Sequence, residues 1–465
     1  MKIKELFYRI KTPVRASVFY LGASVVGKAV GLLTTPYFTR VLSAEDYGKF
    51  SLYMSLLGGI SVIVSAFNSG SAVYSGLDRS SDNEGSYIKG VWYVSCTFSL
   101  LITSVLTVFS PFFGLDRKIA LILSLQIICD GIVATSLCLS KYKYRYTRVF
   151  VISVISAAFP PLIAAAFIRK YGGGYVVRIY SLLAVSVCIA ACALVSIPKS
   201  KEKLKMSEIK RIVKSSLPLL PHTASNALTV QADKLILSTV MGADALAKYS
   251  VVYSLGAGLG FTVSAISGSL SPWIIRRLDR GDEEKISELV IPMIIGYFSL
   301  SAMIMAFAPE TIKILAPESY LDALPALLPL TLCTPFTFLS TVTTVSLVHH
   351  KKGRYSAISS LVGAVCCVVL SFIFISQFGY LGAGMAMLIS KIGEAMTAIY
   401  FLARCGVRNI ISSKLFLPVL LTVLSGIILY QLRGNPIGRF SVLVLPFSIL
   451  LYSLWKGKAL LFEKA

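Results

Sequence analysis

The sequence predicts an all-α protein that crosses a membrane about fourteen times. Its 465 residues are 55% hydrophobic and only 14% charged, with a mean hydropathy of +0.76. Apolar runs recur at the length of about 20 residues that a helix needs to cross roughly 30 Å of hydrocarbon. The strands of a membrane barrel would instead alternate over about 10 residues, and no such pattern is visible. Because helices satisfy their own backbone hydrogen bonds in lipid, a helical bundle is expected.

The predicted spans are separated by short segments. They cover residues 14–38, 50–75, 90–112, 119–140, 149–168, 177–197, 214–238, 249–275, 289–308, 323–348, 355–376, 381–403, 415–432 and 440–455. These short connections leave no room for a separate catalytic domain.

The net charge of +23 reflects membrane topology in this interpretation, and we expect no nucleic-acid partner. With the N-terminus in the cytoplasm, most Lys and Arg residues outside the spans fall on the cytoplasmic side, as the positive-inside rule requires. An even number of spans then places the C-terminus there as well. Two outer loops, Arg169–Arg178 and Arg433–Arg439, break the pattern. The cytoplasmic basic stretches are "MKIKELFYRIKTPVR", "KYKYRYTR", "PKSKEKLKMSEIKRIVK" and "HHKKGR".

The ends and the cysteines suggest neither processing nor metal binding. The first apolar segment is too long for a cleaved signal peptide, so it should remain as a helix. The nine cysteines have no metal-ligand spacing and mostly lie in apolar spans, which argues against a disulfide framework. The neighbouring His349 and His350 would point in different directions on a helix. We therefore predict no metal site.

An internal repeat divides the chain. The stretch "TRVLSAEDYGKFSLYMSL" at 39–56 aligns with "STVMGADALAKYSVVYSL" at 238–255 after a shift of 199 residues. Each copy follows the first span of a set of six. Since six is even, the two halves have the same orientation, which is a parallel repeat of the kind found in transporters. The predicted divisions are an N-terminal lobe at 1–205, a C-terminal lobe at 206–405 and two further helices at 406–465.

Ionisable residues inside predicted spans are the main functional signal. Each costs about 2.5–3.5 kcal/mol at mid-membrane on insertion scales, so such side chains usually face a bundle interior or a wet cavity. Their formal charges sum to zero. They are Lys28, Asp130, Asp233, Lys234, Lys391 and Glu394.

One polar stripe lies on the seventh predicted span. His222, Asn226, Thr229 and Asp233 follow helical spacing and should share one face. The stripe would line a cavity, or it would form a hydrogen-bonded seam between helices. Asp233 and the adjacent Lys234 lie close to the outer end of this span, where they could also be interfacial.

Lys28 lies near the middle of the first span. Two alternatives remain open: it attracts an anionic headgroup, or it pairs with a carboxylate such as Asp130, which shares a helix face with Gln126. The residues predicted to share its face are Ser17, Ser24, Gly31 and Thr35.

Two other sequences carry charge at helical spacing or at a helix end. Lys391 and Glu394 are three residues apart and could pair on one helix, for packing or for function. "KYKYRYTR" at 141–148 combines interfacial tyrosines with cytoplasmic charge. A lesser alternative is an entry platform for a lipid that bears pyrophosphate.

The stretch "LLTTPYFTRVLSAEDYGKFSLYMSL" resembles the first corner of polysaccharide flippases of the multidrug/oligosaccharidyl-lipid/polysaccharide (MOP) superfamily. The most similar members are the O-antigen flippases, usually called Wzx. "NALTVQADKLILSTVMGADALAKYSVVYSL" resembles the matching corner of the second half. The resemblance implies two six-helix lobes around a central cavity, followed by two helices, as in MATE transporters.

The activity implied by the resemblance is transfer of an undecaprenyl-pyrophosphate-linked oligosaccharide from the cytoplasmic to the periplasmic leaflet of a bacterial inner membrane. Alternating access, coupled to H⁺ or Na⁺ and needing no other cofactor, would drive it. The partners would be the substrate, membrane lipids and the polysaccharide polymerase machinery. The candidate substrate-binding residues are Lys28, Arg40, Asn226, Lys234 and Lys391. The candidate coupling or cavity residues are Asp130, His222, Thr229, Asp233 and Glu394.

Two rival functions belong to other classes. A drug or cation antiporter of the same superfamily would favour a net acidic cavity, whereas the charges here balance. An integral-membrane glycosyltransferase or polymerase would need carboxylates in an outer loop, for which Glu45 and Asp46 are the candidates. Such enzymes usually have a large outer loop, and this chain has none, so we do not expect an enzyme.

Overall fold

A computed structural model describes residues 12–68, 73, 84–113, 115–195, 206–407 and 416–462. Within these ranges the chain forms helices joined by short turns and contains no strand. Eleven of the helices are long and apolar enough to cross a membrane. The protein is therefore a multi-pass membrane protein.

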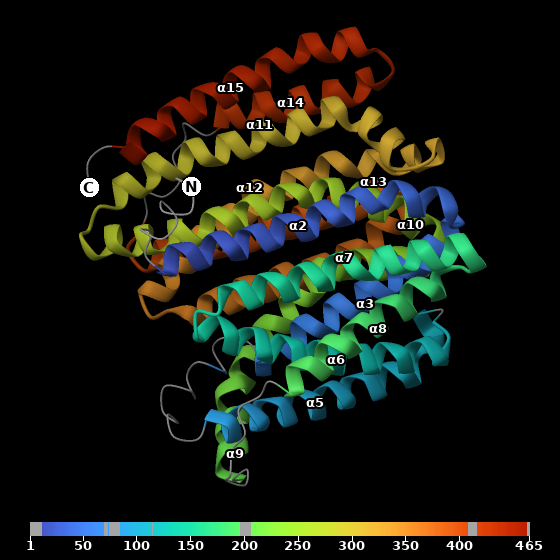
Figure 1. Cartoon of the computed structure of the whole chain (residues 1–465). Helices are drawn as coiled ribbons and strands as arrows, with labels where there is room; N and C mark the ends of the chain where they lie inside the picture. Colours follow the sequence, from blue (N-terminus) through green and yellow to red (C-terminus); the bar gives the residue numbers. More distant parts are fainter. Residues whose placement is uncertain are drawn as a thin grey trace, which may run out of the picture. The chain divides into compact units, whose positions relative to one another are not determined.

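The chain divides into two compact units, Met1–Ala227 and Leu228–Ala465. Figure 1 labels the helices of both. The predicted lobe limits at 205 and 405 remain a prediction.

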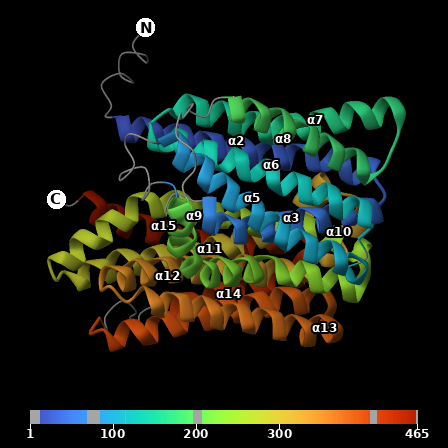
Figure 2. The same cartoon turned by 90° about the horizontal axis from the view of Figure 1, so that it is seen from below.

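The first unit consists of antiparallel helices connected in sequence. The helix α2 packs on α7, and α6 lies between α5 and α8, as Figures 1 and 2 show from two directions. The elements are α2 (Thr12–Val41), α3 (Ala44–Asn68), α5 (Glu84–Phe109), η1 (Ser110–Phe113), α6 (Arg117–Tyr142), α7 (Tyr146–Tyr171), α8 (Tyr175–Val195), α9 (Met206–Ser216), η2 (Leu217–Leu219) and the start of α10 (Leu220–Asp279).

The second unit contains the rest of α10 and the helices that follow it. α11 is its central element, because α12, α14 and α15 all pack against it. Its elements are α11 (Glu283–Leu315), η3 (Glu318–Ala326), α12 (Leu327–His349), α13 (Gly353–Arg404), α14 (Phe416–Gln431), η5 (Leu432–Gly434) and α15 (Pro436–Phe462).

Two of these helices are broken at a glycine. α10 breaks at Gly242 with φ 87°, and α13 breaks at Gly379 with φ 57°. Both angles are in the left-handed region that glycine adopts without steric cost. Once α10 and α13 are divided at these breaks, each predicted span overlaps a helical segment. Residues 69–72, 74–75, 196–197 and 415 of the predicted spans lie outside the described residues. The predicted number of spans is thus a good approximation.

The repeated corner is visible in both units. In the first, α2 ends at Val41, and the Ser43 hydroxyl caps α3 by accepting from the Asp46 N–H at 3.1 Å. In the second unit, the residue aligned with Ser43 is Gly242, where α10 breaks. The aligned lysines also behave alike: Lys49 lies 2.6 Å from Glu45, and Lys248 lies 3.4 Å from Asp244. The two copies therefore share a helix break and a lysine–carboxylate pair one turn later.

The two loops that broke the positive-inside pattern contain arginines held by the protein itself. The Arg178 guanidinium lies 3.9 Å from the ring centre of Phe38 and 3.7 Å from that of Phe50. Arg439 is buried, donates to the Ala306 carbonyl at 2.7 Å and pairs with Glu310 through both terminal nitrogens. These two cations are therefore structural and say little about which side of the membrane the loop occupies.

Candidate functional site

The polar face of α2 is exposed. Ser24, Lys28 and Gly31 are exposed, and Thr35 is partly buried. The Ser24 and Thr35 hydroxyls donate to carbonyls of their own helix. The side chain of Ser17 lies outside the described residues. In the described part of the first unit, Lys28 forms no ion pair.

Asp130 is held by neutral donors. Gln126 Nε2 and Ser186 Oγ each donate to Asp130 Oδ1 at 2.9 Å, and Gln126 also donates to Ser186 Oγ at 2.6 Å. This cluster joins α6 to α8. Gln126 and Asp130 share a face, as the sequence predicts. The alternative in which Asp130 pairs with Lys28 is wrong for this structure, because the carboxylate turns to α8 instead of α2.

Arg40, at the end of α2, is exposed, and its Nη1 donates to the Pro36 carbonyl at 3.0 Å. It lies one turn beyond the Lys28 stripe, beside the repeated corner. Its assignment to substrate binding remains a prediction.

The predicted stripe on α10 changes character along its length. His222 and Asn226 are exposed, whereas Thr229 is 2% and Asp233 0% exposed. The buried end is a seam between helices, since the Thr229 carbonyl accepts from Cys367 Sγ of α13 at 3.6 Å. The buried end therefore matches the seam alternative, and a cavity lined by the exposed end remains a prediction.

Asp233 and Lys234 form the centre of a buried polar cluster. Lys234 Nζ lies 3.7 Å from Asp233 Oδ1, donates to the Val230 carbonyl at 2.6 Å and lies 3.5 Å from the ring centre of Tyr253. Tyr249 donates its hydroxyl to Asp233 Oδ2 at 2.6 Å. Both side chains are under 9% exposed, so neither lies at the surface of the protein. The Asp233 charge is thus balanced inside the unit.

Lys391 and Glu394 on α13 form the predicted local pair, with Nζ and Oε2 2.9 Å apart. Their side chains are 10% and 15% exposed. Ser360 donates to the other carboxylate oxygen at 3.5 Å, and a Cβ added to Gly363 would lie 3.0 Å from Glu394 Cβ. In its described part, the second unit therefore holds a buried cation–carboxylate pair, Lys234–Asp233, and a mostly buried one, Lys391–Glu394.

The sequence analysis missed two tyrosines of the buried cluster and the ring contacts of Arg178. Tyr249 and Tyr253 follow the break at Gly242, which returns the chain toward Asp233, and no short-range spacing reveals that return. The sequence did single out Arg178, because it is a cation in a predicted outer loop, where the positive-inside rule expects few.

These arrangements have different chemical capacities. An exposed lysine on an otherwise unpaired polar face can attract a phosphate. A carboxylate held by neutral hydrogen-bond donors can gain a proton or a cation without losing an ionic partner. The paired charges of the second unit must instead break an existing ion pair to do either.

Known proteins resemble the chain in sequence family and in fold. The family described as polysaccharide biosynthesis protein matches residues 14–278. The lipid II flippase MurJ in its inward closed conformation is 15% identical with a TM-score of 0.69, covering 95% of this chain and 98% of its own. An inward-facing multidrug resistance MATE family transporter of the MOP superfamily is 15% identical with a TM-score of 0.65, covering 82% and 95%.

A MOP superfamily transporter from Pyrococcus furiosus, whose binding pocket is described as reversed in polarity, is 16% identical with a TM-score of 0.56, covering 86% of this chain and 96% of its own. Among curated proteins, none matches the sequence. The structural likenesses establish the fold of the MOP superfamily.

Proposed function

Because the chain belongs to the polysaccharide biosynthesis protein family, we propose that it flips a lipid-linked oligosaccharide across a bacterial inner membrane. The substrate would be an undecaprenyl-pyrophosphate-linked repeat unit of a surface polysaccharide such as O-antigen. The family match over more than half of the chain, on a MOP superfamily fold, is the observation that carries this proposal.

The physical problem in such a reaction is the charged, sugar-bearing head. Its transfer through hydrocarbon is costly for the same reason that charged side chains are costly there. An exposed cation on an unpaired polar helix face offers the pyrophosphate a partner, and Lys28 is the residue best suited to this role. Arg40, Asn226, Lys234 and Lys391 are further candidates, of which the two buried lysines would first have to leave their carboxylates.

Movement of the head would follow alternating access, in which the binding residues face the two leaflets in turn. Coupling to H⁺ or Na⁺ would supply direction. Asp130 is the first candidate for coupling because, among the described residues, its carboxylate has hydrogen-bond donors but no cation beside it. Asp233 and Glu394 come second, with His222 and Thr229 as neighbours on the α10 stripe. The polymerase machinery would receive the flipped unit.

Complementation tests the proposal. The chain is expressed in strains that lack the flippase for a known surface polysaccharide, and polymer at the cell surface is measured. Restored polymer with at least one repeat unit supports the function. Failure across several repeat units, together with drug efflux in a transporter-deficient host, would favour the antiporter. Formation of glycosidic bonds by the purified protein on labelled lipid-linked sugar would favour the enzyme.

A further inference from the structure

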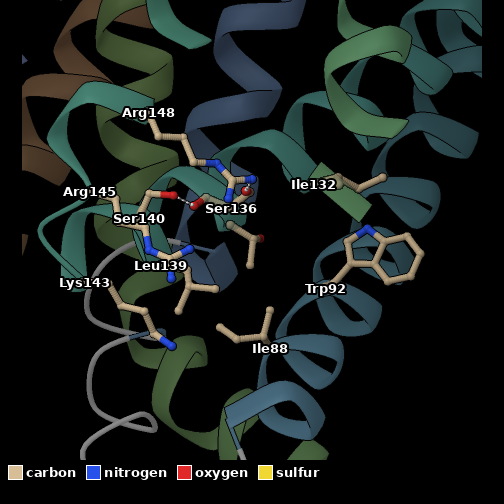
Figure 3. A pocket seen from close by; sticks show the side chains of 10 residues that line it. Ile88, Trp92, Ile132, Ser136, Leu139, Ser140, Lys143, Arg145 and Arg148 are labelled. Atoms are coloured by element: carbon tan, nitrogen blue, oxygen red, sulfur yellow. Dashed lines mark hydrogen bonds between the residues drawn. The ribbon is translucent and has the colours of Figure 1, made fainter. Parts of the chain in front are cut away.

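A basic pocket lies in the first unit, between α5, α6 and the start of α7. Figure 3 shows the cationic side chains of Lys143, Arg145 and Arg148 on one side of it, with Trp92 and Ile88 on the other. The enclosed space is about 40 Å³, and the hydroxyls of Thr135, Ser136 and Ser140 also line it. None of the described residues that line it is acidic.

The turn that follows α6 brings these cations together. Tyr144 adopts φ 52°, a left-handed conformation that a residue other than glycine rarely adopts. The Arg145 N–H donates to the Ser140 carbonyl at 2.8 Å, and the Tyr144 N–H donates to the Lys141 carbonyl at 3.1 Å. This pair of bonds is a Schellman cap. It reverses the chain at once, so Arg145 and Arg148 lie beside the last turn of α6.

The pocket also contains a long hydrogen bond and one buried donor without a hydrogen-bond partner among the described residues. Arg148 Nη2 donates to Ser136 Oγ at a long 3.4 Å. Trp92 Nε1 is buried and has no hydrogen-bond partner among the described residues. A buried donor without a partner costs about 1–3 kcal/mol, so a group with several acceptor oxygens would be stabilised here. Beside these donors, Ile88, Ile132 and Leu139 supply an apolar wall.

The turn between α12 and α13 in the second unit has the same backbone conformation, but different side chains surround it. Lys351 has φ 57°, and the Lys352 N–H donates to the Leu347 carbonyl at 2.9 Å. When the two left-handed residues are aligned, Tyr355 and Thr343 take the places of Arg148 and Ser136. The next residues, Ser356 and Thr344, share a hydrogen bond of 3.1 Å between their hydroxyls. The Schellman cap is therefore common to both turns, whereas the arginine that approaches the helix is particular to the first.

We propose that this pocket binds the phosphate group of a membrane lipid, with Arg145 and Arg148 as its principal ligands, Lys143 and Trp92 Nε1 as further donors, and the start of the lipid tail against Ile88, Ile132 and Leu139. Arginine suits the task because its planar fork matches the oxygens of a phosphate. The lipid is either bulk anionic phospholipid or the polyprenyl diphosphate part of a transported substrate.

Binding by the purified, full-length protein in detergent tests the site without requiring transport, so the result does not depend on the function proposed above. Native mass spectrometry would measure dissociation constants for three probes: short-chain phosphatidylglycerol, farnesyl diphosphate and inorganic phosphate. The test variant is Arg145→Gln with Arg148→Gln. The matched control is Lys352→Gln with Arg354→Gln, which removes two exposed cations at the equivalent turn of the second unit.

We expect the test variant to bind lipid about tenfold more weakly or worse, because the loss of one charge-assisted hydrogen bond has about this effect. The control variant should change the dissociation constant by less than about twofold. Stronger binding of farnesyl diphosphate would identify the substrate as the source, and equal binding of both lipids would identify bulk phospholipid. Equal losses in the two variants, or binding of inorganic phosphate alone, would overturn the proposal.

A second readout uses Trp92, one of three tryptophans in the chain. With Trp273→Phe and Trp455→Phe, the remaining emission comes from Trp92 alone. A phosphatidylglycerol vesicle carrying a nitroxide at its headgroup should quench that emission, and Arg145→Gln with Arg148→Gln should reduce the quenching. Quenching that the two arginine substitutions leave unchanged would contradict the proposed site. It would show that the headgroup lies near Trp92 without Arg145 and Arg148 as ligands.

Discussion

The two units differ in whether the charged side chains of the candidate site are paired with an opposite charge. In the second unit, each buried carboxylate of the candidate site has a lysine beside it, Asp233 with Lys234 and Glu394 with Lys391. In the first, Asp130 has only neutral donors, and Lys28 is exposed. A neutral buried pair can hold a fold together without taking part in transport. An unpaired cation or carboxylate inside a membrane has no such structural explanation.

This difference predicts that the charges of the two units have different roles, which substitutions can test. If it is correct, changing one charge of a lysine–carboxylate pair in the second unit mainly lowers stability, and changing Asp130 or Lys28 in the first unit mainly lowers transport. Arg178 of the first unit, which is held between aromatic rings, should behave like the structural charges. The four substitutions below run from the largest expected change in the free energy of unfolding to the smallest.

Asp233→Ala should be the most destabilising. It leaves the Lys234 ammonium buried without its carboxylate and removes the acceptor of the Tyr249 hydroxyl, and breaking a buried pair in this way typically costs about 3–5 kcal/mol. Thermal unfolding of the purified protein in detergent measures the loss. Asp233→Leu with Lys234→Met, which removes both charges, should recover much of it. A double variant as unstable as the single one would show that the pair itself is not the cause.

Arg178→Met should cost about 2 kcal/mol, the value for a desolvated cation over an aromatic face. Methionine is an unbranched but shorter side chain, and it lacks the charge that Arg178 places between Phe38 and Phe50. The same unfolding assay would detect it, with Arg169→Met at the exposed end of α7 as the control. Equal effects of the two substitutions would contradict a structural role for Arg178, and its place outside the positive-inside pattern would need another explanation.

These two residues also show how far the sequence could predict the site. The helical spans, the repeated corner and the Lys391–Glu394 pair follow from patterns of length and of three or four residues. The partners of Asp233 and Arg178 do not. Tyr249 approaches Asp233 only after the break at Gly242, and Arg178 contacts rings from α2 and α3. Whether Asp130 would turn to Lys28 or to Ser186 depended on how α6 packs, which no local spacing reveals.

Asp130→Asn should change stability by less than about 1 kcal/mol, because the amide oxygen can still accept from Gln126 and Ser186 and only the stronger, charge-assisted character of those bonds is lost. The side chain can then no longer take up a proton or hold a cation. If Asp130 couples transport to an ion, export of polymer should fall and lose its dependence on the ion gradient. Export that still responds fully to the gradient would move coupling to Asp233 or Glu394.

Lys28→Ala should leave the free energy of unfolding within about 0.5 kcal/mol, as for exposed side chains without partners. Its effect should appear in transport, where the loss of the cation removes a partner for the pyrophosphate. Polymer export at constant expression measures it, and Lys28→Arg should retain much of the activity because it keeps the charge. Ser24→Ala, one turn earlier on the same face of α2, is the matched control, because it changes the same helix surface without removing a charge. Normal export by Lys28→Ala would remove this lysine from the mechanism, and the exposed charge of the first unit would then be no more functional than the paired charges of the second.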